Sequence, residues 1–342
     1  MTAQRPLRVA LLGYGLAGRV IHRPLLQAVP DLDVTHVVTA DPGRRSAAAA
    51  DLPAARIVGS AAVLWEQERD FDVVVIATHN DVHTSLARAA LGVGKAVVVD
   101  KPLALSSSDA AALAAYALSK HLVLSVFHNR RWDSDTLTAR SLLAAGTLGT
   151  VHRLESRFTR FRPQVQQRWR EQPGGGGVLL DLGTHLVDQA MHVLGPVTSV
   201  HAEVRALRPG ATVDDDAFLA LTHESGASSL LWCSAAAPWT GPRLVLQGSS
   251  AGWVKADLDG QEDAQRRGVA PGAEPDGTLH DERGAHPVPS LPGDWAQFYR
   301  EFALAVRGKG PVPVDVQDAV RVQQVLEAAA ASSARQQIVH LG

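Results

Sequence analysis

The sequence predicts an α/β protein with a doubly wound parallel sheet in residues 1–126 and an α+β domain in residues 127–342. Strand-like and helix-like runs alternate through the first part, which is typical of right-handed βαβ units. The run Asp72–Thr78 is apolar at nearly every position, as in a strand buried on both faces of a parallel sheet. After about residue 127, β-rich runs are separated by glycine, proline and aspartate, which favours an antiparallel or mixed sheet.

Length and composition fit two globular domains. The chain has 342 residues, of which 46% are hydrophobic and 20% charged, with a formal net charge of −2. Domains commonly hold roughly 100–200 residues, and a nucleic-acid partner would need a concentrated basic face. No apolar run approaches the roughly 18 residues of a membrane span. Because Arg8–Leu12 runs into glycines without a cleavage site, it predicts a first strand rather than a signal peptide. We therefore expect a cytoplasmic protein with no nucleic-acid or membrane partner.

The single cysteine, Cys233, excludes an intrachain disulfide and a thiolate metal cluster. It lies in the strand-like run Ser228–Ser234, where we expect it to be a small apolar residue. One thiol also fits a reducing compartment.

In the first part we expect strands and helices in alternation. The expected strands are Val9–Leu12, Val34–Thr39, Asp72–Thr78, Ala96–Val99 and Leu122–Phe127. The expected helices are Ala17–Ala28, in which Pro24 is an awkward interior residue, Val82–Leu91 and Ser106–Lys120.

In the second part the pattern predicts helices around a sheet. The expected helices are Thr136–Ala145, Val178–Val193, Trp295–Arg307 and Val316–Ala334. The expected strands are Val197–Leu207, Ala217–Thr222, Ser228–Ser234, Arg243–Gly248 and Trp253–Lys255, with β-formers also in Gly149–Arg162. Gly268–Pro292 is rich in glycine, proline and aspartate and predicts a loop.

The segment Gly13–Gly18 carries the pattern G-x-G-x-x-G, with Leu16 and Ala17 inside it. Alone this pattern is weak, but here it follows a strand and opens a helix, as a dinucleotide-binding loop requires. Gly13 would allow the tight turn, Gly15 the close approach of the pyrophosphate, and Gly18 close packing of helix on strand. The free N–H groups at the helix start would bind the anion. We therefore expect NAD or NADP as the cofactor.

The choice between the two dinucleotides depends on the end of the second strand. NAD-binding proteins carry a carboxylate there for the ribose 2′-OH, and Asp41 lies near that place. Thr39, Arg44 and Arg45 also lie close by, and an arginine there can hold a 2′-phosphate. Both arginines could equally belong to a solvated helix turn. We slightly favour NADP.

Two further motifs suggest a catalytic cleft. Asp100-Lys101-Pro102 directly follows a strand, and ligands bind beyond the carboxyl ends of strands in open α/β sheets. In Asp181–Asp188, Asp181 and His185 have the i, i+4 spacing of one helix face, with Asp188 on the same side. An equally open interpretation is that Asp181 caps the helix and His185 is a packed surface residue.

In these motifs together, the sequence resembles the Gfo/Idh/MocA oxidoreductases, which include glucose–fructose oxidoreductase and inositol dehydrogenase. The resemblance covers most of the chain. The segments that carry it are Gly13–Gly18, Ala77–Asn80, Asp100–Pro102, His128–Asp133, Arg168–Arg170 and Asp181–Asp188. The family usually has Glu-Lys-Pro where this chain has Asp100-Lys101-Pro102, an exchange that keeps the charge.

The resemblance implies a Rossmann domain followed by an open, mostly antiparallel sheet domain that commonly forms dimers or tetramers. It also implies a catalytic Lys101, Asp181 and His185, and a polyol or sugar as the small-molecule substrate. Among the branches, the chain looks most like the scyllo-inositol dehydrogenases that use NADP. Neutral His185 can take the alcohol proton, Lys101 can stabilise the developing alkoxide, and Asp181 can orient the imidazole or bind a neighbouring hydroxyl.

Further contacts are expected from residues that follow strands. Those predicted to line the cofactor groove are Thr78, His79, Asn80, His83, Asp100 and Lys101. Asn129 and Arg130 are predicted to touch the nicotinamide or the substrate, and Asp181 and His185 the substrate. Trp169 is predicted to line the substrate pocket, although a core tryptophan is an equal alternative. We expect no metal, because the nicotinamide can accept the hydride and no third ligand accompanies His79 and His83.

Two other functions fit the same resemblance. Some relatives look like NAD-dependent glycoside hydrolases, which oxidise transiently and leave no net reduced cofactor. A redox-sensing binding protein could use the same fold without catalysis, although the joint presence of Lys101, Asp181 and His185 argues against it.

Overall fold

The computed structural model describes residues 5–166 and 168–342, which form two compact units. The first unit holds the described residues up to His128 together with Glu262–Ala270 and Trp295–Val320. The second unit holds Asn129–Gln261, Pro271–Asp294 and Arg321–Gly342. The division into domains 1–126 and 127–342 remains a prediction from sequence. The first compact unit differs from the predicted first domain chiefly because it also contains Glu262–Ala270 and Trp295–Val320.

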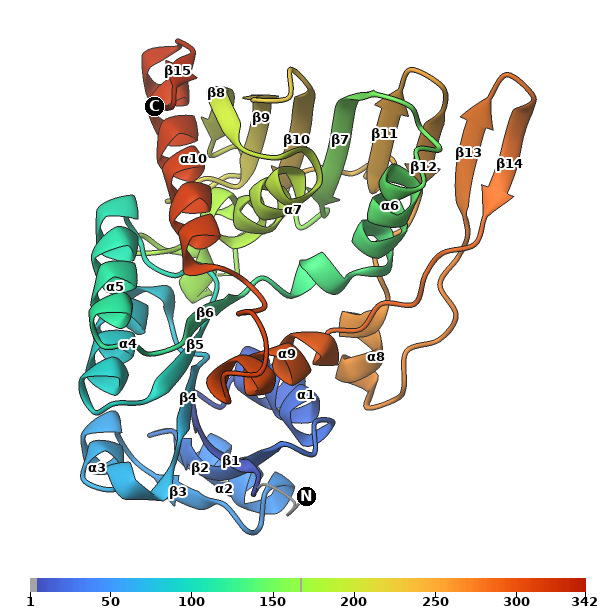
Figure 1. Cartoon of the computed structure of the whole chain (residues 1–342). Coiled ribbons are helices and arrows are strands. Elements are labelled where there is room, and N and C mark those ends of the chain that lie inside the picture. Colours follow the sequence, from blue (N-terminus) through green and yellow to red (C-terminus); the bar gives the residue numbers. More distant parts are fainter. Residues whose placement is uncertain (1–4, 167) are drawn as a thin grey trace. The chain divides into compact units, whose positions relative to one another are not determined.

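The first unit is built on a six-stranded sheet of order β3-β2-β1-β4-β5-β6 (Figure 1). Its strands are β1 (Leu7–Leu12), β2 (Leu32–Val38), β3 (Arg56–Val58), β4 (Val73–Ile76), β5 (Ala96–Asp100) and β6 (Leu124–Phe127). Every neighbouring pair is parallel. This is the doubly wound sheet that the strand–helix alternation predicts.

Helices cover both faces of this sheet. They are η1 (Ala17–His22), α1 (Arg23–Gln27), α2 (Pro42–Asp51), α3 (Ala61–Trp65), η2 (Glu68–Asp70), η3 (Asn80–Val82), α4 (His83–Gly92), α5 (Ser107–Ser119) and α9 (Ala296–Val306). Figure 1 shows α4 and α5 on one side of the strands and α1 and α9 on the other. Accordingly, all four residues of β4 are buried, as predicted for a strand enclosed on both faces.

The second unit contains a nine-stranded sheet of order β14-β13-β12-β11-β7-β10-β9-β8-β15. The strands are β7 (Val151–Thr159), β8 (Val197–Arg205), β9 (Asp216–His223), β10 (Ser228–Ser234), β11 (Leu244–Gly248), β12 (Gly252–Lys255), β13 (Gly277–Asp281), β14 (Gly284–Val288) and β15 (Val339–His340). Only β7 and β10 pair in parallel among these strands. The mostly antiparallel sheet is therefore confirmed.

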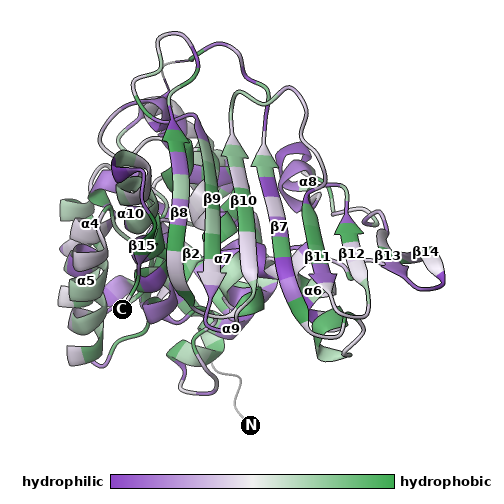
Figure 2. Cartoon of the chain, turned by 90° about the horizontal axis from the view of Figure 1, so that it is seen from above, coloured by the Kyte–Doolittle hydropathy of each residue, from purple (hydrophilic) through white to green (hydrophobic). Residues whose placement is uncertain are grey.

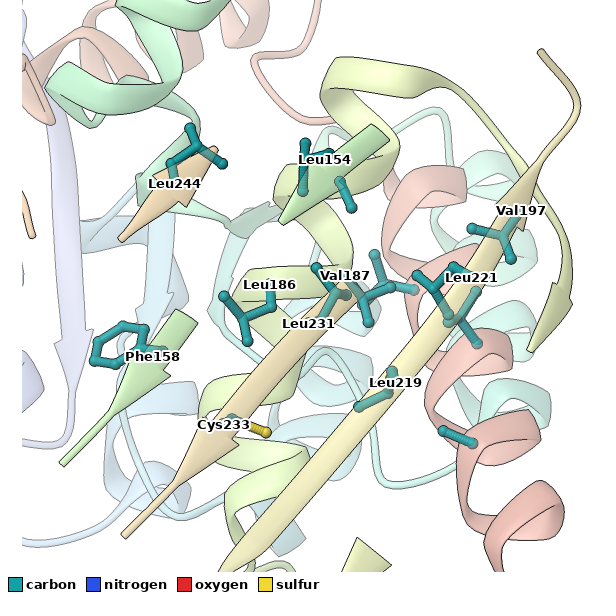
Figure 3. Packing of buried hydrophobic residues seen from close by; sticks show 14 of the residues in the cluster. Leu154, Phe158, Leu186, Val187, Val197, Leu219, Leu221, Leu231, Cys233 and Leu244 are labelled. Atoms are coloured by element: carbon teal, nitrogen blue, oxygen red, sulfur yellow. The ribbon is translucent and has the colours of Figure 1, made fainter. Parts of the chain in front are cut away.

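One face of this sheet carries the core of the second unit. The covering helices are α6 (Ser134–Ala144), η6 (Leu179–Gly183), α7 (Thr184–Leu194) and, from Arg321 on, α10 (Val316–Arg335). Figure 3 shows Leu186 and Val187 of α7 beside Leu231 of β10. Cys233 is fully buried in this core, and burial raises the pKa of its thiol well above the ordinary value. The expected role of Cys233 as a small core residue is confirmed.

The other face of the sheet is only half-buried. Alternate residues of β9 illustrate the difference, because Leu219 and Leu221 are buried while Phe218 and Ala220 are not. Figure 2 shows β7 to β12 side by side with α6 and α7 behind them.

The predicted loop Gly268–Pro292 is wrong in part, because it contains the hairpin of β13 and β14. Its strands are short and carry glycine and Pro287, so their composition resembles a loop. The predicted helix Val178–Val193 begins with the π-helical segment η6 rather than a regular α-helix. The short elements α2, β3 and α3, and the helix α8 (Gln261–Arg267), were not assigned from the sequence.

We expect Leu219→Ala to destabilise the second unit, because Leu219 is 0% exposed in the sheet core. Removing such a side chain costs about 2–5 kcal/mol, which a lower midpoint of urea unfolding would report. Leu207, which is 52% exposed, supplies the matched control, and Leu207→Ala should leave the midpoint nearly unchanged. Equal shifts for the two variants would contradict the assigned core.

Candidate active site

The carboxyl ends of four parallel strands lie in register in the first unit. Leu12 pairs with Ile76, Ile76 with Val99, and Asp100 with Phe127. The residues that follow three of these ends are the predicted ligand-binding residues Gly13, Thr78 and Lys101. Strand pairing therefore brings three predicted site segments to one edge of the sheet.

Each glycine of Gly13–Gly18 has a different local environment, which explains why a glycine stands there. Gly13 has φ +94°, and a Cβ there would collide with the carbonyl of Ala77. A Cβ on Gly18 would collide with the carbonyl of Gly13, so this glycine allows the helix to pack against the turn. Gly15 is not crowded, because a Cβ there would meet only the Arg44 guanidinium, at an ordinary contact distance of 3.7 Å. These positions match the roles that the fingerprint requires, including an open approach at Gly15.

The helix after this loop starts with π-helical η1, in which the Arg19 N–H donates to the Gly15 carbonyl at 2.9 Å. Leu16 is 44% exposed in the loop, and Ala17 opens the helix. A second π-helical segment, η6, carries Asp181. Such segments are frequent at functional sites, and here both coincide with predicted site motifs.

Asp41 and Arg44 lie at the start of α2. The Asp41 carboxylate accepts a hydrogen bond from the Arg44 backbone N–H at 2.8 Å and so caps the helix. The Arg44 side chain extends toward Gly15. Thr39 is buried, and its backbone N–H donates to the Val58 carbonyl. Of these residues, Arg44 presents a charge beside the glycine loop.

The segment after β4 holds Thr78, His79 and Asn80. Thr78 is half-buried, His79 is exposed and Asn80 is buried. His83, predicted to line the cofactor groove, is fully buried, with Nδ1 at 2.8 Å from the Pro102 carbonyl and Nε2 at 3.3 Å from the Thr78 carbonyl. The ring therefore lies between the backbone carbonyls of two loops.

Burial lowers the pKa of His83, so the ring is neutral near pH 7 and carries a single N–H. We assign that N–H to the shorter contact with Pro102. His83 thus supports the carbonyl that follows Lys101.

Asp100 ends β5, and its Oδ1 accepts a hydrogen bond from the Lys101 backbone N–H at 2.8 Å. Burial by itself would raise the pKa of the Asp100 carboxyl. The interaction with His22 and the charge of Lys101 outweigh burial, and the pKa lies well below its ordinary value. Asp100 is therefore ionised at neutral pH, and Lys101 is half-buried beside it.

In the second unit, Asn129 and Arg130 lie in the short helix η4 (Asn129–Trp132), and both are buried. Arg130 donates to Asp133 at 2.9 Å and stacks over the Phe158 ring at 4.6 Å. His185 of α7 also stacks on Phe158, with ring centroids 6.2 Å apart. Phe158 was not identified from the sequence, because a phenylalanine inside a β-rich run carries no sign of a site.

Asp181 and Trp169 share a neighbour, Arg170. The Arg170 guanidinium lies 3.2 Å from the Asp181 carboxylate and 4.4 Å from the centroid of the Trp169 ring. Both Trp169 and Asp181 are half-buried. Trp169 is thus connected to the Asp181 segment rather than enclosed in the core.

Asp188 forms a buried ion pair with Arg131, whose NH2 lies 2.6 Å from Oδ1 and whose Nε lies 3.0 Å from Oδ2. Such a two-point pair anchors α7 to η4. Asp188 therefore has a structural partner, which the helix spacing alone did not indicate.

Among residues 5–166 and 168–342, no group of three or more histidine, cysteine, aspartate or glutamate side chains could hold a metal ion. In the same described residues, no helix is long and apolar enough to cross a membrane.

We expect Asp188→Ala to lower the melting temperature strongly, because it leaves the buried Arg131 guanidinium without its counter-charge, at a cost of about 3–5 kcal/mol. The double variant Arg131→Met with Asp188→Ala removes both charges and should lose less stability than either Arg131→Met or Asp188→Ala alone. Differential scanning calorimetry of the three variants tests this. A double variant as unstable as the sum of the two singles would contradict the coupling.

Comparison with known protein families matches both parts of the chain. Residues 7–128 match the oxidoreductase family model with an NAD-binding Rossmann fold, and residues 136–254 match the GFO/IDH/MocA C-terminal domain.

Similar proteins span the whole chain. The uncharacterized oxidoreductase YdgJ of Escherichia coli is 39% identical over 94% of each chain. The scyllo-inositol 2-dehydrogenase (NADP(+)) IolW of Bacillus subtilis is 34% identical over 98% of this chain and 96% of its own. The solved structure of the oxidoreductase yvaA from Bacillus subtilis covers 100% of both chains with a TM-score of 0.94 and 32% identity. The chain therefore belongs to the Gfo/Idh/MocA family of oxidoreductases, with an NAD-binding Rossmann fold in its N-terminal part.

Proposed function

We propose that this protein is an NAD(P)-dependent dehydrogenase that acts on a CH–OH carbon of a cyclitol or sugar. The observation that carries the proposal is the position of Lys101, which follows β5 at the same edge of the sheet as the glycine loop. An ammonium group at that edge suits an alcohol oxygen that is held beside a bound nicotinamide. The similarity to a scyllo-inositol 2-dehydrogenase supports a polyol as the substrate class.

The proposed chemistry divides between two side chains. When bound, the nicotinamide supplies the hydride chemistry. His185 removes the alcohol proton as the general base, since the reference pKa of a histidine lies near the working pH. Lys101 donates a hydrogen bond to the same oxygen as negative charge develops on it. The proposal therefore requires Lys101 and His185 to reach one substrate oxygen.

Other residues of the second unit are proposed to hold the substrate. Asp181 would accept a hydrogen bond from a neighbouring hydroxyl, with Arg170 as its counter-charge at 3.2 Å. Trp169 would form one wall of the substrate pocket, because its ring packs against Arg170, the residue that also pairs with Asp181. Asn129 and Arg130 would contribute from η4, where Arg130 packs on the ring that also contacts His185.

We expect Lys101→Ala to abolish measurable turnover while dinucleotide affinity stays within about 3-fold, because the ammonium acts on the developing alkoxide rather than on the cofactor. Steady-state rates on a panel of inositols and aldoses, with fluorescence titration of the dinucleotide, measure both quantities. The exposed Lys120→Ala is the control. Turnover that survives Lys101→Ala would refute the catalytic assignment.

We further propose that the cofactor is NADP rather than NAD. Arg44 is the charged side chain beside Gly15, whereas Asp41 is engaged in capping α2. A 2′-phosphate beside the glycine loop would pair with the Arg44 guanidinium, which suits phosphate geometry.

Arg44→Ala should raise the KM for NADP by about 10- to 100-fold, since a hydrogen bond to a charged group contributes about 1.5–3 kcal/mol. The KM for NAD should change little, because NAD has no 2′-phosphate. The exposed Arg56 on β3 is the matched control. Equal effects on both cofactors would exclude a role in phosphate recognition.

The open face of the second sheet is proposed to form the interface of a homodimer or tetramer. On this face Phe218 and Trp232 lie 5.2 Å apart, and Arg157 stacks over Trp232 at 4.0 Å. Aromatic and arginine side chains are enriched at protein interfaces.

We expect light scattering to give an oligomeric mass for the wild type and a lower mass for Trp232→Asp, which places an unpaired charge at the centre of that face. A surface change away from this face, Leu118→Asp on α5, should leave the mass unaltered. A wild-type monomer, or an unchanged mass for Trp232→Asp, would contradict the interface.

A further inference from the structure

A buried chain of polar groups runs behind the Asp100–Lys101 segment in the first unit. The Tyr299 hydroxyl lies 2.6 Å from Nδ1 of His22, and Nε2 of His22 lies 3.8 Å from Oδ2 of Asp100. The side chains of His22 and Tyr299 are fully buried. None of the sequence motifs pointed to this chain, because Tyr299 is 277 residues from His22.

The three residues come from three different elements. His22 ends η1, the helix that follows the glycine loop, Asp100 ends β5, and Tyr299 lies in α9. Aromatic rings enclose the histidine, with the Phe127 ring centroid 4.5 Å from that of His22. In such an apolar setting a polar group is costly unless it is hydrogen-bonded.

We infer the tautomer of His22 from its contact with the Tyr299 hydroxyl. Burial raises the pKa of Tyr299 well above its ordinary value, so the hydroxyl keeps its proton and can donate it to Nδ1. With Nδ1 as an acceptor, the ring N–H is on Nε2, which is the nitrogen that faces the Asp100 carboxylate.

The two oxygens of the Asp100 carboxylate have different neighbours. Oδ1 accepts the backbone N–H of Lys101 at 2.8 Å, whereas the His22 ring lies 3.8 Å from Oδ2, a distance of ionic contact rather than of a hydrogen bond. On the other side of Lys101, the Pro102 carbonyl is bonded to the buried His83. Two buried histidines thus lie on either side of Lys101, with His83 against the Pro102 carbonyl and His22 facing the Asp100 carboxylate.

We propose that His22, oriented by Tyr299, is a positioning residue that fixes the Asp100 carboxylate and thereby the direction of the Lys101 side chain. The proposal rests on the proposed function, in which Lys101 acts on the substrate oxygen. His22 touches neither substrate nor cofactor in this account. Its effect passes through the carboxylate and the Lys101 backbone.

A buried histidine with a purely structural role is available for comparison in the same unit. His36 on β2 is 5% exposed, packs on Phe71 at 5.8 Å and contacts the Thr35 hydroxyl at 3.0 Å. Like His22 it is buried and packed against an aromatic ring, but it lies away from the Asp100–Lys101 segment. His36→Phe is therefore the matched control for His22→Phe.

The test compares His22→Phe, Tyr299→Phe and His36→Phe by turnover and by amide hydrogen exchange of the peptide that contains Lys101. We expect His22→Phe to lower kcat by about 10- to 100-fold, because small misplacements of a catalytic group have effects of that size. The KM for the dinucleotide should stay within about 3-fold, since Lys101 acts on the substrate. The Lys101 amide should exchange faster, because its acceptor is no longer fixed.

Tyr299→Phe keeps the ring packing and should give a smaller change in the same direction. In the His22→Phe background it should add nothing, because both residues act in one chain. His36→Phe should lower the melting temperature while kcat and the exchange at Lys101 stay at wild-type values.

Unchanged exchange at Lys101 in both the Tyr299 variant and a folded His22 variant would overturn the proposal, as would additive effects of the two changes. Hydrogen exchange needs no substrate, so it decides the positioning role even if the wild type oxidises no polyol. A wild-type protein that oxidises no polyol would refute only the proposed function. If His22→Phe does not fold, Tyr299→Phe alone decides between the two outcomes.

Discussion

The parallel register of β1, β4 and β5 is the constraint on which the candidate site depends. Because Leu12, Ile76 and Val99 are paired partners, the loops that follow them begin at one edge of the sheet. Lys101 lies 83 positions after Gly18, the last residue of the glycine loop. Strand pairing brings the two segments to the same edge of the sheet. The binding and the catalytic functions proposed for the first unit thus depend on one hydrogen-bonded sheet.

Much of this arrangement was predictable from local patterns. The spacing of Gly13, Gly15 and Gly18 reports steric limits that act over a few residues, so the sequence shows them directly. The apolar run at β4 and the tripeptide Asp100-Lys101-Pro102 at the end of β5 also allowed two further loops to be predicted at the same edge of the sheet. The precise bounds of η1 and η6 were not predictable, because the local pattern does not distinguish a π-helical turn from an α-helical one.

The supporting contacts were not predictable, since they join distant segments. His83 was expected to line the cofactor groove, and its position between the carbonyls of Pro102 and Thr78 was not foreseen. Asp188 was expected on the catalytic face of its helix, whereas its partner is Arg131 of η4. The chain from Tyr299 to Asp100 depends on how α9, far along the sequence, packs in the first unit. Fold class and motif positions therefore come from sequence, and the residues that hold the motifs in place come from the structure.

The two units contribute different chemistry in the proposed enzyme. The first offers an ammonium group on a firmly held backbone, and the second offers an imidazole packed on an aromatic ring that several arginines also contact. Alcohol oxidation needs both a base and a stabilising charge at the same oxygen. Each of these groups is fixed within its own unit by buried contacts.

The most direct test of this account is a crystal structure of the protein with NADP and a bound cyclitol. The account predicts that Lys101 Nζ and a ring nitrogen of His185 both lie within about 3.2 Å of one substrate oxygen, whose carbon faces the nicotinamide. Side chains of Lys101 and His185 that face separate cavities in that complex would contradict it.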